Sequence, residues 1–227
     1  MQDKSNFNDL SNIHLVIHHA TLNPHQTLDS FYESCDCAKH FNFGGFSTDL
    51  SKLCMAKERI GKASHTKVIA AISFPFGSIP SSLKRSQAEW AIEHGAEELE
   101  VVPNFFALSQ GKTDLFGEEL ALICELGIPV RVIINVANLP ENILSTAISS
   151  AIDAGISSVQ SGNGFGKPVN DSDIKKIDNI TKGRCSIKAV GGIRKISHLS
   201  SLLEAGANII GTSYGQELIE EIRGQQN

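Results

Sequence analysis

Five polar side chains stand inside short runs of otherwise apolar residues. They are His18 in LVIHH, Glu100 in ELEVV, Arg131 in VRVII, Gln160 in SSVQS and Lys188 in SIKAV. A buried charge is stable only when it is paired, so these groups either converge on one another or mark misread strands. A lysine beside a second cation loses its proton more easily, and a neutral lysine is a nucleophile or a base. We therefore take these five as candidate catalytic residues, and the alternative is a structural ion-pair network that closes the fold.

Two glycine-rich turns follow the last two apolar runs. One contains Gly191 and Gly192, and the other contains Gly211, Thr212 and Ser213. Backbone N–H groups around glycine can surround an oxyanion, as they do in many phosphate-binding turns. We expect both turns to bind substrate. The alternative is that they only start the helices that follow them.

The elements that position these residues repeat along the chain. An amphipathic stretch ends in glycine and continues into a short apolar run at Gly95, Gly127, Gly155, Gly183 and Gly206, at intervals of 32, 28, 28 and 23 residues. A glycine there supplies the left-handed end of a helix, and the interval is the length of one βα unit.

Three upstream apolar runs, at 13–19, 41–47 and 67–74, read as further strands, with helices expected at 27–40 and 48–60. Eight βα units predict an α/β fold, a (β/α)₈ TIM barrel in a single domain over 1–227, with a polar N-terminal extension at 1–12. The alternative is a doubly wound open sheet. In a barrel the active site lies at the carboxyl ends of the strands, where these polar residues would meet.

Composition limits the partners of the chain. Its 20 Lys and Arg against 25 Asp and Glu give a net charge of -5, which argues against nucleic acid and anionic membrane as partners. We find no metal-ligand spacing among the histidines and expect no cofactor. Five cysteines, an odd number, suit a reducing compartment, and no apolar run approaches the length of a membrane span. We expect a cytoplasmic protein.

The segments around these residues resemble the deoxyribose-phosphate aldolase family, over nearly the whole chain. The likeness is carried by IHHATLNP, FPFG, HGAEELEVVPN, SVQSGNGFG, IKAVGGIR and AGANIIGTSYG. The family are class I aldolases, lyases that use a lysine Schiff base to cleave 2-deoxyribose 5-phosphate to glyceraldehyde 3-phosphate and acetaldehyde. The resemblance implies a TIM barrel, a small aldehyde or sugar phosphate as ligand, a part in carbohydrate catabolism, and a monomer or homodimer.

The chain departs from the family where the chemistry is expected. The family's Schiff-base lysine ends strand six in a Lys-Thr-Ser-Thr-Gly-Phe type motif, and this position is Gln160, whose amide cannot form an imine. The strand-seven lysine matches Lys188. The other matches are substitutions: Glu100 and His18 for aspartates, Arg131 for a lysine and Ser47 for a cysteine.

The leading hypothesis is an aldolase-like carbon–carbon lyase with altered chemistry. Lys188 would form the imine, Arg131 would lower its pKa, and Glu100 would act as general acid and base. Gln160 and His18 would orient hydroxyl or carbonyl oxygens, and Ser47 would contact the substrate. Two alternatives stay open. One is an enzyme that uses Lys188 at a carbonyl without an imine, and the other is a catalytically silent barrel that binds a phosphosugar or a partner protein.

Overall fold

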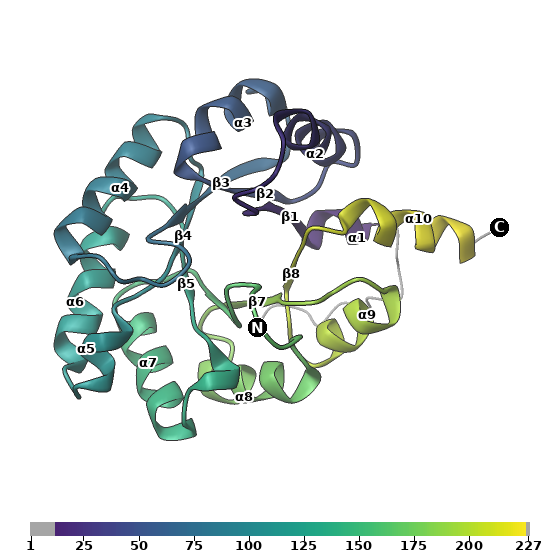
Figure 1. Ribbon diagram of the computed structural model, residues 1–227. Coiled ribbons are helices and arrows are strands. Elements are labelled where there is room, and N and C mark those ends of the chain that lie inside the picture. Colours follow the sequence, from purple (N-terminus) through teal and green to yellow (C-terminus); the bar gives the residue numbers. More distant parts are fainter. Residues whose placement is uncertain (1–11, 226–227) are drawn as a thin grey trace.

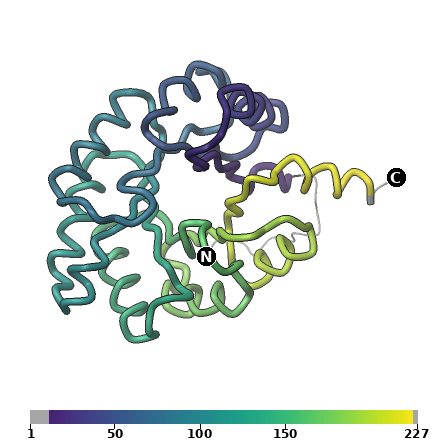
Figure 2. The backbone as a smooth tube through the Cα atoms, viewed as in Figure 1, coloured from purple at the N-terminus to yellow at the C-terminus, as the bar shows by residue number. Residues whose placement is uncertain are grey.

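The computed structural model describes residues 12–225, and within them eight parallel strands pair in sequence order and close into a barrel (Figure 1). β1 pairs with both β2 and β8, so the first and last units of the chain lie side by side (Figure 2). The strands are β1 (Ile17–Thr21), β2 (Gly45–Asp49), β3 (Lys67–Ile72), β4 (Glu98–Val101), β5 (Val130–Ile133), β6 (Ser158–Gln160), β7 (Ser186–Val190) and β8 (Ile209–Thr212). The predicted (β/α)₈ TIM barrel is confirmed, and the open sheet is excluded.

Helices surround the barrel on the outside, as Figure 1 shows. They are α1 (Ile13–Val16), α2 (Leu28–His40), α3 (Leu53–Ile60), α4 (Ser81–Glu93), α5 (Phe105–Ser109), α6 (Thr113–Cys124), α7 (Glu141–Asp153), α8 (Asp171–Thr181), α9 (Ile196–Glu204) and α10 (Gly215–Gln225), with short 3₁₀ turns η2 (Leu50–Lys52) and η3 (Val136–Asn138). The glycines expected at helix ends adopt left-handed backbone angles, for example φ 95° at Gly95 and 96° at Gly155.

Around Glu100, Arg131 and Lys188 the strands alternate between apolar and polar side chains. Leu99, Val132 and Ile187 belong to the apolar core that the helices cover. Their neighbours in the same strands, including Glu100 and Arg131, are buried and polar. Because successive residues of a strand face opposite sides, the apolar set faces the helices and the polar set faces the lumen. The polar residues are therefore one face of the barrel and do not mark misread strands.

The first two strands begin later than the sequence predicts. Residues 13–16 form a helical turn, α1, in which Leu15 is 51% exposed, and β1 starts only at Ile17. Phe41 ends α2 and Asn42 has a left-handed φ of 51°, so β2 starts at Gly45. Each apolar run contains a strand together with the segment that precedes it in the chain. Hydropathy alone does not separate the two, because both are apolar.

The predicted polar extension at 1–12 lies outside the described residues except for Asn12. Across residues 12–225, no helix has the length and apolar character needed to cross a bilayer.

One buried ion pair lies outside the lumen, between α4 and α6. Lys84 Nζ donates to Glu119 Oε1 at 2.7 Å, and both side chains are almost completely buried. Glu119 also accepts from Ser81 Oγ at 2.5 Å and from the backbone N–H of Asn104 at 2.9 Å. The carboxylate thus ties α4 to the loop that follows β4, the strand that carries Glu100.

We predict that Glu119→Ala destabilises the fold by about 3–5 kcal/mol, because it leaves the Lys84 amine buried without its partner. Urea unfolding measures the change. Glu118→Ala, at the exposed neighbouring position on the same helix, is the matched control and should alter stability by less than about 0.5 kcal/mol. Equal stability of the two variants would contradict this account of the pair.

Candidate active site

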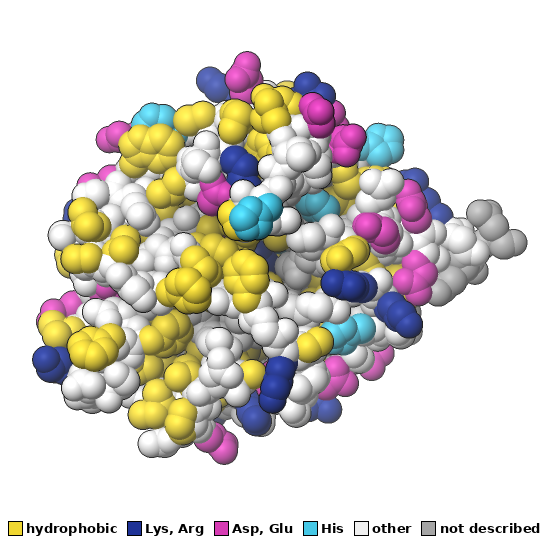
Figure 3. All heavy atoms as spheres, viewed as in Figure 1, with side chains coloured by type: hydrophobic (Ala, Val, Ile, Leu, Met, Phe, Trp, Pro, Cys, Tyr) yellow, Lys and Arg dark blue, Asp and Glu magenta, His cyan; other side chains and the backbone are white. Residues whose placement is uncertain are grey.

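A cavity of about 260 Å³ lies at the carboxyl ends of the strands. The face drawn in Figure 3 is hollowed near its centre, with hydrophobic side chains beside the hollow. The predicted site residues that line the cavity are Glu100, Gln160, Lys188, Gly191, Gly192, Gly211, Thr212 and Ser213. These come from β4, β6, β7, β8 and the two turns that follow β7 and β8. Among the described residues, Lys188 is the one lysine that lines this cavity.

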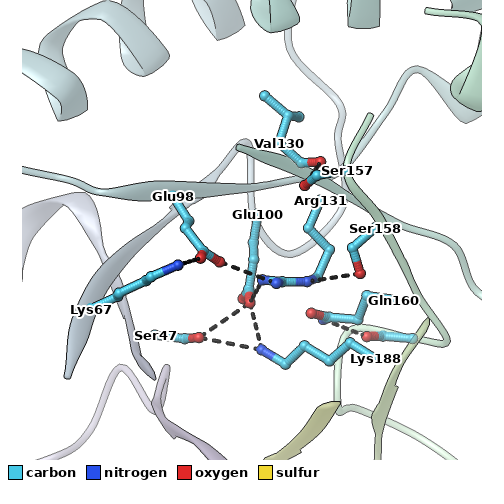
Figure 4. A network of polar contacts seen from close by, with 11 residues as sticks. Ser47, Lys67, Glu98, Glu100, Val130, Arg131, Ser157, Ser158, Gln160 and Lys188 are labelled. Atoms are coloured by element: carbon cyan, nitrogen blue, oxygen red, sulfur yellow. Dashed lines mark hydrogen bonds and ion pairs between the residues drawn. The ribbon is translucent and has the colours of Figure 1, made fainter. Parts of the chain in front are cut away.

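Glu100 is the centre of a buried network at the cavity floor (Figure 4). Its Oε1 accepts from Lys188 Nζ at 2.5 Å, from Arg131 Nη1 at 3.0 Å and from Ser47 Oγ at 3.2 Å. Lys188 Nζ also lies 3.4 Å from Ser47 Oγ. Lys188 and Glu100 are each only 1% exposed. The predicted convergence of charges in the lumen is therefore present, across β2, β4, β5 and β7.

The network continues to a residue that the sequence analysis missed. Arg131 Nη2 donates to Glu98 Oε2 at 3.1 Å, and Lys67 Nζ donates to Glu98 Oε1 at 2.7 Å. Arg131 Nε also donates to Ser158 Oγ at 3.2 Å. A signal was available, because Glu98 and Glu100 are two residues apart in one strand and must face the same side. We call Ser47, Lys67, Glu98, Glu100, Arg131 and Lys188 the lumen network.

The pKa of Lys188 is lowered to about 8, chiefly by burial and also by the charge of Arg131, against the opposing effect of Glu100. The predicted influence of Arg131 is thus present, but burial is the larger cause. Burial alone would raise the pKa of Glu100. The charges of Lys188 and Arg131 outweigh that effect and hold the pKa of Glu100 below its usual value, so the carboxylate is ionised.

The lumen network contains three cationic side chains, Lys67, Arg131 and Lys188, against two carboxylates, Glu98 and Glu100. The Lys67 side chain is 53% exposed, so its charge is solvated at the other end of the barrel. The buried members balance when all are ionised, with Arg131 and Lys188 against Glu98 and Glu100. Burial nevertheless lowers the pKa of Lys188 to about 8, so this amine can give up its proton near neutral pH.

Three predicted site residues lie outside the cavity lining. His18, Arg131 and Ser47 are buried in the lumen and do not line the cavity. His18 is two residues before Ala20, the β1 residue that does line it, so its ring sits one layer deeper on the same face. Burial, with the charges of Lys188 and Arg131, holds the pKa of His18 well below its ordinary value. Direct orientation of substrate by His18, and substrate contact by Ser47, are not supported by this geometry.

The two glycine turns differ from each other. Gly191 and Gly192 have φ of 127° and 68°, a left-handed backbone that L side chains rarely adopt, and α9 begins four residues later. Gly211 instead lies within β8, where an added Cβ would be 2.6 Å from Lys188 Cε. Gly211 therefore makes room for the lysine, in addition to lining the cavity.

The hydroxyls next to Gly211 already have protein partners. Thr212 Oγ1 donates to Ile193 O at 2.7 Å, and Ser213 Oγ donates to Ala20 O at 2.7 Å. These bonds tie the β8 turn to the turn after β7 and to β1. They fix the shape of this rim of the cavity.

Arg194 is a cavity residue that the sequence analysis did not single out, although it ends the IKAVGGIR segment. Its guanidinium lies 4.5 Å from the centroid of the Tyr214 ring, and both residues line the cavity. An arginine beside the turn of Gly191 and Gly192, with the first turn of α9 close by, is suited to hold a phosphate. Asn163 and Phe165, from the loop after β6, complete the opposite rim.

A second cavity of about 180 Å³ lies on the other side of that loop. Lys167, the lysine seven residues after Gln160, lines this second cavity and not the first. Among the described residues no three His, Cys, Asp or Glu side chains are grouped so that they could hold a metal ion. The catalytic and binding roles of the site residues stay predictions.

Two known proteins are similar to this chain over most of its length, although no family model matches it. The chain is 33% identical over 206 residues to the deoxyribose-phosphate aldolase of Microcystis aeruginosa, covering 90% of this chain and 91% of that one. It is 32% identical to the deoxyribose-phosphate aldolase of Thermococcus gammatolerans, covering 91% and 95%.

Solved structures are similar over the same length. An aldolase designated QR15 superposes with a TM-score of 0.89 at 29% identity, covering 95% of this chain and 97% of that one. The deoxyribose phosphate aldolase of Aeropyrum pernix superposes with a TM-score of 0.84 at 26% identity, covering 94% and 92%. With these identities over nine-tenths of its length, the chain belongs to the deoxyribose-phosphate aldolase family.

Proposed function

We propose that this protein is a carbon–carbon lyase that acts on a small phosphorylated hydroxyaldehyde, of the 2-deoxyribose 5-phosphate type, through an imine on Lys188. The observation that carries the proposal is a buried lysine with a pKa lowered to about 8 at the edge of a cavity. A neutral amine is required for attack on a carbonyl, and burial supplies it near neutral pH. Family membership supports the reaction class. A cytoplasmic location and a monomeric or dimeric state stay predictions.

The change at strand six supports a relocated nucleophile. The position at which the family resemblance expects the imine-forming lysine is Gln160, and its side chain lies next to Lys188 because the two residues pair across β6 and β7. An amine on Lys188 reaches the same cavity from the neighbouring strand. The imine would therefore form a short distance from its place in the relatives.

The proposed reaction balances with groups that line the cavity. Lys188 Nζ forms a C–N bond with the aldehyde carbon, and the carbonyl oxygen leaves as water. The iminium then accepts the electron pair of the breaking carbon–carbon bond, while the hydroxyl proton on the far carbon passes to Glu100. Glu100 suits this step because it is ionised and 2.5 Å from Lys188. The product of this step is an enamine on Lys188, and Glu100 returns the proton to its carbon to give an iminium. Addition of water to that iminium releases the second aldehyde and returns the free amine.

A second candidate has its own support. The tight contact of Lys188 with Glu100, with Ser47 beside both, would suit a proton-transferring pair that acts at a carbonyl without an imine. In that case the charged lysine polarises the carbonyl oxygen, and the carboxylate moves a proton. The two candidates differ in whether a covalent bond to Lys188 forms.

Borohydride trapping separates the candidates. With 2-deoxyribose 5-phosphate or acetaldehyde present, reduction should attach mass to Lys188, located by peptide mass spectrometry. Lys188→Ala should abolish trapping and lower the turnover rate by about 10³-fold or more, whereas Lys167→Ala should preserve both. Turnover without a trapped adduct would favour the non-imine enzyme. Stabilisation by 2-deoxyribose 5-phosphate in a thermal shift assay, with no turnover across an aldehyde panel, would favour a silent binding barrel.

The trapping rate should rise with pH, with its inflection near pH 8, because only the neutral amine of Lys188 attacks and its pKa is about 8. Glu100→Gln should move this inflection to lower pH, since Glu100 raises the pKa of Lys188. Initial rates of acetaldehyde trapping between pH 6 and pH 10 measure it. Glu118→Gln, on the exposed side of α6, should leave the inflection in place. An inflection that Glu100→Gln moves to higher pH would contradict the electrostatic account.

A further inference from the structure

Gln160 carries a polar atom without a partner inside the site. The side chain is 2% exposed and lines the larger cavity. Its amide nitrogen donates to Gly162 O at 2.7 Å, whereas its carbonyl oxygen Oε1 is buried and has no hydrogen-bond partner within the described residues. A buried acceptor that lacks a donor is costly, so a group that binds here is expected to supply one.

The direction of this amide is fixed by the backbone. Gly162 O can only accept a hydrogen bond, so the nitrogen of Gln160 must face it. Oε1 is then the amide atom that does not face Gly162, and Figure 4 shows the Gln160 amide beside the Lys188 side chain. Gln160 therefore offers the ligand an acceptor and not a donor.

We propose that Gln160 Oε1 accepts a hydrogen bond from a substrate hydroxyl, and that this bond makes the site selective for polyhydroxylated phosphate esters. The inference rests on the proposed function and narrows its substrate class. A carbonyl oxygen at this place would meet another acceptor and leave both unpaired. The ligand group at Gln160 is therefore a hydroxyl, while the carbonyl belongs at Lys188.

The charges around the site exclude the other common donor, an ammonium group. Both carboxylates of the lumen network already pair with cations of the protein, Glu98 with Lys67 and Arg131, and Glu100 with Arg131 and Lys188. An ammonium group at Gln160 would lie beside the Lys188 amine without a carboxylate of its own, whereas a neutral hydroxyl adds no charge.

The position of Gln160 also fixes where the hydroxyl sits on the ligand. Gln160 and Lys188 pair in register across β6 and β7, and both line the cavity. Neighbouring strands are roughly 4.8 Å apart, a distance spanned by a few bonded carbon atoms. The selected hydroxyl is therefore close along the carbon chain to the carbon that meets Lys188. The phosphate lies further away, toward Arg194 and the glycine turn.

Two unreactive probes test the inference without turnover. Ribitol 5-phosphate carries a hydroxyl on each of the carbons that do not bear the phosphate. Pentyl phosphate has the same number of carbons and carries no hydroxyl on them. Calorimetric titration should show that the wild-type protein binds ribitol 5-phosphate about tenfold or more tightly than pentyl phosphate. Gln160→Met, which keeps the length of the side chain and removes the acceptor, should shrink this ratio severalfold. Gln110→Met, at an exposed position after α5, should preserve it.

Each outcome separates the inference from the proposed function. A ratio that Gln160→Met leaves unchanged overturns the hydroxyl contact, even if borohydride still traps Lys188. If Gln160→Met weakens the binding of both probes equally, the hydroxyl contact is also overturned, because a purely structural role gives that result. Failure of ribitol 5-phosphate to bind the wild-type protein overturns the inference and the phosphorylated substrate class together. Trapping that fails while the ratio depends on Gln160 overturns the imine and leaves the hydroxyl contact standing.

Discussion

The Glu100 carboxylate is the constraint on which the barrel interior depends. TIM-barrel lumens are usually filled by branched aliphatic side chains, and here charged residues of β4, β5 and β7 occupy part of that space. Such a core is stable only if each charge is paired, and a single oxygen of Glu100 accepts from Lys188, Arg131 and Ser47. Removal of the Glu100 carboxylate would leave Lys188 and Arg131 buried without this acceptor. The group that stabilises the barrel interior is therefore also the group that lies next to the candidate catalytic lysine.

The same surroundings act differently on Lys188 and Arg131. Both are buried next to Glu100, but a guanidinium does not lose its proton in proteins, whereas burial of an ammonium lowers its pKa readily. Of these two cations, Lys188 is therefore the one that can become neutral, with a pKa of about 8. Burial and the charges of Lys188 and Arg131 hold the pKa of His18 well below its ordinary value, so His18 adds no charge to the lumen near neutral pH.

Much of this arrangement can be predicted from sequence. The glycine-ended repeats specify the eight-unit barrel, because helix ends and short apolar strands are local features. The polar residues in those strands identify the lumen, since alternation puts Glu100, Arg131 and Lys188 on one face. What local patterns do not reveal is depth along the barrel. His18 has the right type and the right face, yet it lies below Ala20 and outside the cavity lining, a consequence of strand stagger. The sequence places the start of β2 too early for a related reason. Phe41 and Phe43 are apolar, but they belong to the connection between α2 and β2.

Gly211 shows how a sequence motif can mislead about its own role. Its place in GTSYG suggests a backbone cradle for phosphate, and it does line the cavity. Its position within β8 and the 2.6 Å between an added Cβ and Lys188 Cε point to a steric requirement as well. The lysine side chain crosses from β7 to Glu100 on β4, and only a residue without a side chain leaves that path open. The glycine of β8 and the lysine of β7 therefore act as one structural unit. The contact of Lys188 with Glu100 therefore depends on the absence of a side chain at Gly211.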